Sequence, residues 1–149
     1  MEQPNAKPLL DPQGEVSALT LDQHGTWAVT SISATVYYLD LGLDHPPMLL
    51  RHPGPGSPTG PYDDVWLVLV EVASATDTGR IEIGRRHRYT VDPAPGALGR
   101  WIWWVQRTVT AITAVTNPPR GRTPGPHELD VGFGRPATGG PAATGGTAE

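Results

Sequence analysis

The stretch TWAVTSISATVYYLDL, residues 26–41, contains mostly β-branched and aromatic side chains. Such side chains fit the pleated surface of a sheet, and they lose conformational freedom in a helix. We therefore expect two strands, at about 26–32 and 35–41, that meet near Ser33-Ala34. This turn lacks the Gly or Asn that tight hairpins prefer, so one long bent strand is the alternative.

Strand patterns continue after residue 41. The run VWLVLV at 65–70 is apolar on both faces, which predicts a central strand covered on both sides. Further stretches of strand character follow at 80–83, 86–91, 101–106 and 108–115. No stretch has the periodicity of a long helix. The sequence therefore predicts an all-β fold, a small single-domain barrel or sandwich of about six or seven short antiparallel strands.

Proline and glycine mark the limits of this domain. The chain has 149 residues, of which 18 are Gly and 17 are Pro, and these crowd outside the expected strands. We expect a flexible N-terminal arm at 1–23, the β domain at 24–116 and a disordered tail at 117–149. Within the domain, residues 42–61 form a long Pro/Gly loop, interrupted by the apolar residues 48–50. A loop of this length signals either function or disorder.

Two segments outside the main strands have weaker patterns. Residues 15–22 fit either a short strand or one helical turn. Residues 127–133, HELDVGF, form the only apolar island in the tail and are a candidate docking segment.

The composition argues against several classes of protein. The chain has no Cys, which excludes disulfides, thiolate metal sites and a Cys nucleophile. No apolar run of 18 residues exists, so we expect no contact with a membrane. The N-terminus lacks the basic start and apolar stretch of a secretory signal, so the expected location is the cytoplasm.

The residues that most often perform catalysis do not form a recognisable motif. The five histidines lack the spacing of metal ligands, and no G-x-S-x-G nucleophile motif exists. The doublet Asp63-Asp64 points to opposite faces of a strand, which favours a solvated strand entry over acid–base chemistry. We therefore expect no enzyme, no catalytic residue, no metal and no cofactor.

Charge is divided unequally along the chain. Residues 1–79 contain two basic and ten acidic side chains, whereas residues 80–122 contain eight Arg against Glu82 and Asp92. Three tryptophans lie in this basic part. The alternation of residues 86–91 places His87, Tyr89 and Val91 on one face and the arginines on the other. We predict that the residues facing a partner are Arg85, Arg86, Arg88, Trp104 and Arg107. We predict that the core includes Trp27, Tyr37, Leu67, Leu69, Trp101 and Trp103.

This combination of residue types favours a binding protein. Trp, Tyr and Arg are enriched at the energetic centres of protein interfaces, and exposed edge strands accept a partner's strand. An acidic half and a basic half also favour self-association. We therefore expect a non-catalytic protein-binding or assembly module. Binding of single-stranded nucleic acid is the alternative, because arginines follow phosphates while aromatic rings stack on bases. The sequence pI of about 5.7 is low for such a protein. A further alternative is that the arginines form a solvated face that pairs with the acidic half.

Several short motifs, taken in order, resemble those of a known group of proteins. The motifs are WAVT at 27–30, YYLDL at 37–41, RHPG at 51–54, IG at 83–84 and TVTAI at 108–112. They are similar to small uncharacterised β-rich proteins of actinobacteria and their phages, in which a Trp strand precedes a YxLDL strand, an RHPG stretch and a closing TxVTxI strand. The chain departs from that group at its first turn and in a longer insertion at 53–62. The resemblance implies a small β fold and an actinobacterial or mobile-element origin, and it implies no activity.

Overall fold

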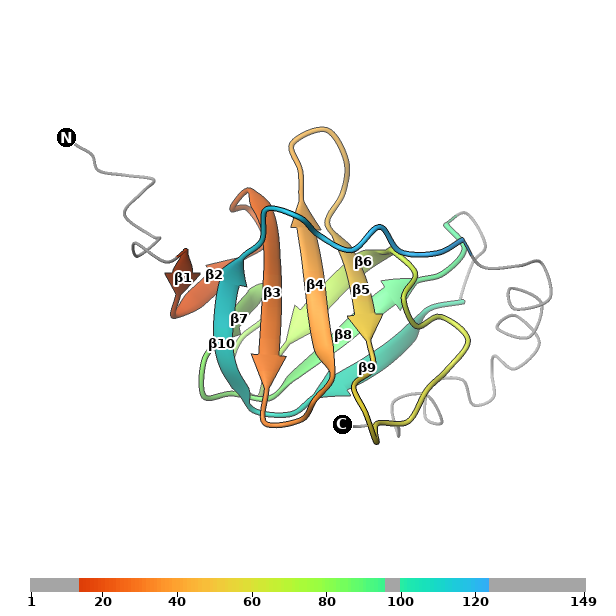
Figure 1. The fold of residues 1–149 in the computed structure, drawn as a ribbon. Coiled ribbons are helices and arrows are strands. Elements are labelled where there is room, and N and C mark those ends of the chain that lie inside the picture. The colour runs from red at the N-terminus through yellow and green to blue at the C-terminus, as the bar shows by residue number, and fades with distance from the viewer. Residues whose placement is uncertain (1–13, 96–99, 124–149) are drawn as a thin grey trace.

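The computed structural model describes residues 14–95 and 100–123 (Figure 1). Every regular element in these two ranges is a β-strand, which confirms the all-β prediction. The strands are β1 (Glu15–Val16), β2 (Ala18–Thr20), β3 (Gly25–Ser31), β4 (Val36–Leu41), β5 (Met48–His52), β6 (Leu67–Ala73), β7 (Arg80–Glu82), β8 (His87–Asp92), β9 (Ile102–Gln106) and β10 (Val109–Ala114).

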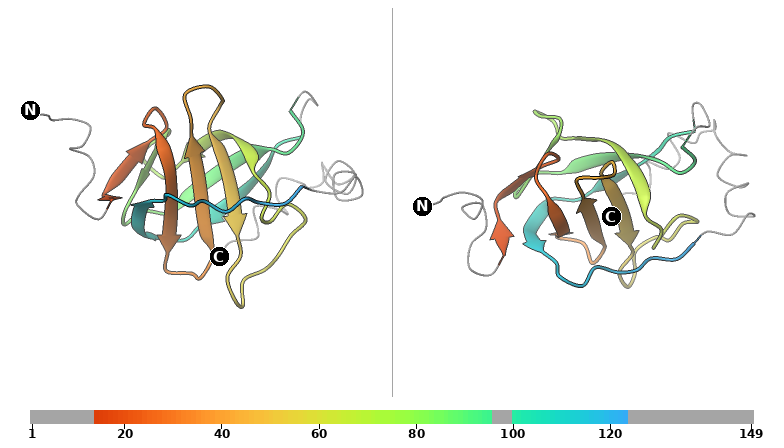
Figure 2. Two further views of the ribbon diagram at one scale, coloured as in Figure 1. Left: turned by 45° about the horizontal axis from the view of Figure 1, so that its top comes forward. Right: turned by 90° about the horizontal axis from the view of Figure 1, so that it is seen from above.

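Eight of the strands form one antiparallel sheet in the order β1-β10-β3-β4-β5-β6-β8-β9. The sheet bends at the β5–β6 pair, so that β3, β4 and β5 form one layer and β6, β8 and β9 form the other (Figures 1 and 2). The remaining strands, β2 and β7, pair with each other. The sheet does not close, because β1 and β9 are its two edges. The architecture is therefore sandwich-like, with the core between the layers.

The core is centred on aromatic side chains from both layers. Tyr37 of β4 stacks on Tyr89 of β8 with ring centroids 4.8 Å apart. The Tyr89 hydroxyl donates to Gln106 Oε1 at 2.5 Å, and Gln106 Nε2 donates to the carbonyl of Val29 at 2.9 Å. A fully buried amide on β9 is thus satisfied by partners in both layers, which fixes how they pack. The core predictions for Trp27, Tyr37, Leu67 and Leu69 are confirmed.

The first hairpin consists of two strands, β3 and β4, rather than one bent strand. Its turn lacks the Gly or Asn that tight hairpins prefer, and serine hydroxyls stabilise it instead. Ser31 Oγ accepts a hydrogen bond from the Ser33 N–H at 3.1 Å, and Ser33 Oγ accepts one from the Thr35 N–H at 3.0 Å. Ser side chains stabilise turns in this way by bonding the backbone two residues ahead.

The predicted faces of β9 are wrong. Trp101 is 53% exposed and Trp103 is half-buried, whereas Trp104, expected to face a partner, is only 5% exposed. The register explains the difference, because Trp104 pairs with the buried Tyr89 while Trp103 pairs with Thr90. A shift of one residue exchanges the faces of a strand, and the run WIWWV is apolar at every position. The apolar pattern therefore does not indicate which face of β9 is buried.

Strand β6 is central, since it lies between β5 and β8, but only one of its faces is well covered. Val70 is 37% exposed on the other face, next to a register shift between Leu69 and Glu71. The prediction that this strand is covered on both sides is therefore wrong for its second half.

The ordered fold extends beyond the range 24–116. Strands β1 and β2 lie within the expected N-terminal arm, so the stretch 15–22 contains two short strands rather than a helical turn. Strand β5 lies within the expected loop 42–61. The segment 117–123, expected in the tail, crosses the outer side of β3, β4 and β5 (Figures 1 and 2). The rest of the arm and tail predictions lies outside the described residues.

Candidate interaction surface

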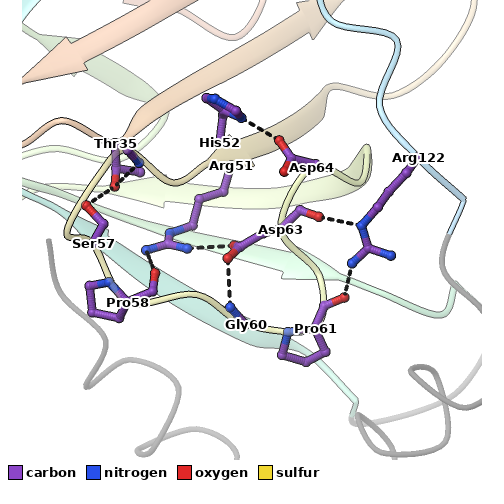
Figure 3. A network of polar contacts seen from close by, with 11 residues as sticks. Thr35, Arg51, His52, Ser57, Pro58, Gly60, Pro61, Asp63, Asp64 and Arg122 are labelled. Carbon is purple, nitrogen blue, oxygen red and sulfur yellow. Dashed lines mark hydrogen bonds and ion pairs between the residues drawn. The ribbon is translucent and has the colours of Figure 1, made fainter.

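A buried ion pair orders the loop between β5 and β6 (Figure 3). Arg51 Nη1 donates to Asp63 Oδ1 at 2.6 Å, and the two side chains are only 1% and 7% exposed. Arg51 Nη2 also donates to the carbonyl of Pro58 at 3.0 Å, and the Gly60 N–H donates to Asp63 Oδ2 at 2.7 Å. Asp63 is therefore the counter-ion of a buried arginine, and its expected role as a solvated strand entry is wrong.

The neighbouring Asp64 has a different environment. Its Oδ1 lies 2.6 Å from Nδ1 of the exposed His52, and its backbone has a φ of 64°. The two adjacent aspartates thus serve separate partners, and they do not converge on a common site. Within the described residues no group of three or more His, Asp or Glu side chains is placed to hold a metal ion.

The segment 117–123 is fixed to the same loop (Figure 3). Arg122 donates from Nε to the Asp63 carbonyl at 3.0 Å and from Nη2 to the Pro61 carbonyl at 2.7 Å. Trp66 Nε1 donates to the Pro119 carbonyl at 3.1 Å. These bonds hold the segment against the fully buried Leu50, so the outer face of this layer is covered there.

The other layer has a basic and aromatic outer face. On β8 the predicted alternation is confirmed, because His87, Tyr89 and Val91 are buried while Arg86 and Arg88 are exposed. The Arg88 guanidinium lies 5.8 Å from the centre of the Trp103 ring on β9, a cation–π contact. Its Nη2 is 3.9 Å from Glu71 Oε1 on β6.

Next to this contact lies a shallow hollow of about 250 Å³. It is lined by Ala73, Ser74, Ala75, Arg86, His87, Arg88 and Val105. The guanidinium groups of Arg86 and Arg88 on its wall are hydrogen-bond donors of the kind that pair with carboxylates and phosphates.

The predicted interface residues are only partly brought together. Arg86 and Arg88 share the outer face with Trp103, and Arg107 is exposed at the corner after β9. Arg85 lies in the β7–β8 turn, where its Nε donates to Glu82 Oε1 at 3.1 Å. Trp104 is in the core, 6.2 Å from the Tyr37 ring. The exposed Trp101 takes its place as the available ring, and only knowledge of the β8–β9 register would have identified it.

Strand β9 also leaves one backbone edge open. It pairs with β8 on one side, and in the described part of the chain no backbone hydrogen bond joins its other side to another segment. It contains no Pro or Lys, the residues that usually protect an edge. The opposite edge of the sheet, β1, has only two residues. Among the described strands of the large sheet, β9 is therefore the one suited to accept another strand.

Behind this edge, His87 is a buried neutral side chain. It is 1% exposed, and its Nε2 accepts a hydrogen bond from the Glu82 N–H at 3.1 Å. Its Nδ1 has no hydrogen-bond partner among the described residues. The pKa of His87 is lowered to about 4, mainly by burial, which the negative charge of Glu82 offsets in part and the positive charge of Arg85 reinforces. The imidazole thus joins β8 to β7 in its uncharged form.

No helix in residues 14–95 and 100–123 is long and apolar enough to cross a membrane. Comparisons of the chain with protein-family models, with curated proteins and with solved structures found no match.

Proposed function

We propose that this protein is a non-catalytic protein-binding module that accepts an extended segment of a partner protein along β9. The observation that supports this proposal is the open backbone edge of β9 beside Trp101, a residue that is 53% exposed. Backbone groups of an edge strand supply hydrogen bonds to any extended peptide, and side chains on the flanking face select among peptides.

The side chains around the edge are of the types that supply binding energy. When a Trp at the centre of an interface is replaced by Ala, the complex typically loses about 2 kcal/mol or more of binding free energy. Trp101 and Trp103 offer such rings, and Arg88 is held over Trp103 rather than free in solvent. This pre-arrangement reduces the conformational entropy that binding would cost.

Single-stranded nucleic acid is the second candidate, because the Arg88–Trp103 contact resembles a site where a base stacks beside a phosphate-binding arginine. Two features weigh against it. Trp104 is buried, and the carboxylates of Glu71 and Glu82 lie beside Arg88 and Arg85. Titration of a labelled oligothymidylate separates the two functions. If the surface binds nucleic acid, we expect binding at low salt. The logarithm of the association constant should then fall with the logarithm of the salt concentration, with a slope of roughly −0.7 per phosphate contacted.

The protein-binding proposal is tested by cross-linking from defined positions. A photo-reactive amino acid replaces Trp101 in one variant and Leu43 in the control, and both proteins are expressed in the native host. Leu43 is 81% exposed in the β4–β5 loop and is not part of the binding surface proposed along β9. We expect a discrete cross-linked protein from position 101 and none from position 43. Equal patterns from the two positions, or no product from position 101, would refute the proposal.

A further inference from the structure

The inner face of β9 is already covered by the core of its own chain, although β9 is the last strand of its layer (Figure 1). Ile102, Trp104 and Gln106 point inward and are at most 9% exposed. An isolated peptide added to this edge would place its inward side chains beyond that core. A strand that is itself the edge of a sandwich brings inward side chains that its own second layer already buries. The β9 edge of a second copy of this chain therefore meets the requirement as it stands.

The two faces of β9 determine how two copies can pair. A twofold axis makes the two β9 strands antiparallel, and inner faces must then lie opposite inner faces. Only registers in which one residue faces its own copy meet this condition. The register centred on Trp104 pairs all five residues of β9. It places Trp103 of one copy opposite Val105 of the other on the outer face.

The residues that flank β9 complement each other in this register. Trp101 and Arg107 lie three positions to either side of Trp104, so each Trp101 lies across from Arg107 of the other copy. Trp101 is 53% exposed and Arg107 is also exposed. A guanidinium that covers an indole ring makes a favourable cation–π contact. Strand β9 itself has no charged residue, so the pairing brings no like charges together within the strands.

We propose that two copies of this chain associate through their β9 edges as an antiparallel pair centred on Trp104, which joins the β6-β8-β9 layers of both copies into one sheet. This inference rests on the proposed function, because it names the partner whose strand occupies the same edge. Each copy contributes a five-residue strand and its flanking side chains, a smaller contact than the interfaces of about 1,200 Å² or more that hold stable complexes. We therefore expect a reversible dimer with a dissociation constant between about 10 μM and about 1 mM.

Sedimentation equilibrium of the full chain measures this association. Between about 10 μM and about 1 mM protein, the average mass should rise from that of one chain toward that of two, as mass action requires. Val105→Lys should stay monomeric, because lysine on an edge strand opposes pairing, while Leu43→Lys should associate like the natural chain. A natural chain that stays monomeric at the highest concentration would overturn the inference, as would equal association of the two lysine variants.

The register is tested with engineered cysteines, since the chain has none of its own. Directly opposite residues of an antiparallel pair have Cα atoms about 4.5–5.5 Å apart, which a disulfide can bridge. Under mild oxidation, Trp103→Cys chains mixed with Val105→Cys chains should form linked dimers at least about tenfold faster than either variant alone, whose cysteines lie diagonally and out of bridging range. A mixture that links no faster than the single variants would overturn the inference.

The outcome is separable from that of the proposed function. Mass spectrometry identifies what is cross-linked to position 101 in the native host. A product that contains only this chain supports both proposals. A product with a different protein, together with a monomeric chain in sedimentation, supports the proposed function and overturns the inference. The absence of a product refutes the proposed function, and the cysteine mixture still decides whether two copies pair along β9.

Discussion

The buried Arg51–Asp63 pair predicts a large loss of stability when only one of its members is removed. In the substitution Asp63→Asn, the Arg51 guanidinium stays buried at 1% exposure without its counter-ion. The Asp63 carboxylate accepts two short hydrogen bonds, at 2.6 and 2.7 Å, and each bond to a charged group is worth about 1.5–3 kcal/mol. Breaking a buried pair costs about 3–5 kcal/mol. The total stability of a domain is only about 5–15 kcal/mol, so we expect the free energy of unfolding to fall by roughly half.

The assay is urea unfolding followed by tryptophan fluorescence. Arg51→Met/Asp63→Leu removes both charges and should be more stable than Asp63→Asn alone, because no unpaired charge remains buried. Asp64→Asn is the matched control, since the Asp64–His52 pair is 41% and 56% exposed and should contribute about 1 kcal/mol or less. If Asp63→Asn lowers the free energy of unfolding no more than Asp64→Asn does, the conclusion that the Arg51–Asp63 pair stabilises the loop is refuted.

Two further predictions concern His87 and the tryptophans. The pKa of His87 is about 4 in the folded chain and 6.5 in the unfolded chain, so the folded chain binds fewer protons between these values. The contribution of neutral His87 to stability is therefore complete above pH 6.5, and about 3 kcal/mol of it is lost as the pH falls through 4. His87→Leu should flatten this part of the pH profile of the urea midpoint, and an unchanged profile would contradict the prediction. Trp104→Ala should lower the free energy of unfolding by about 3–5 kcal/mol, whereas Trp101→Ala should change it by no more than about 0.5 kcal/mol. Equal thermal midpoints for the two variants would show that the assigned faces are wrong.

Local sequence patterns predict which face of a strand is buried when the other face is polar. The alternation of residues 86–91 is unambiguous, because arginines and buried side chains take turns, and both faces of β8 follow from it. In the run WIWWV every residue is apolar, and Gln106, the only polar residue of β9, is itself buried. The correct face of β9 depends on its register with β8, which is a long-range property. The pattern therefore places Arg86 and Arg88 correctly on an exposed face, and it places Trp104 wrongly.

Contacts between distant parts of the chain explain the other differences. Asp63 resembles a solvated carboxylate until Arg51, twelve residues away, is placed beside it. The segment 117–123 has the composition of a flexible tail, yet Arg122 and Trp66 fix it through hydrogen bonds to backbone carbonyls. Strand β5 is short and lies between prolines, and its pairing with β4 outweighs the weak local signal.

The most direct test of the central claim, that β9 is a binding edge, is the affinity of an edge-blocking variant for the partner recovered by cross-linking. Val105→Lys places a charge on the outer face of β9, where lysine opposes strand addition, and Leu43→Lys adds the same charge in the β4–β5 loop. Titration calorimetry should show that Val105→Lys weakens binding at least about tenfold, while Leu43→Lys leaves it within about twofold of the natural chain. Equal affinities of the two lysine variants, with both folded, would contradict the account.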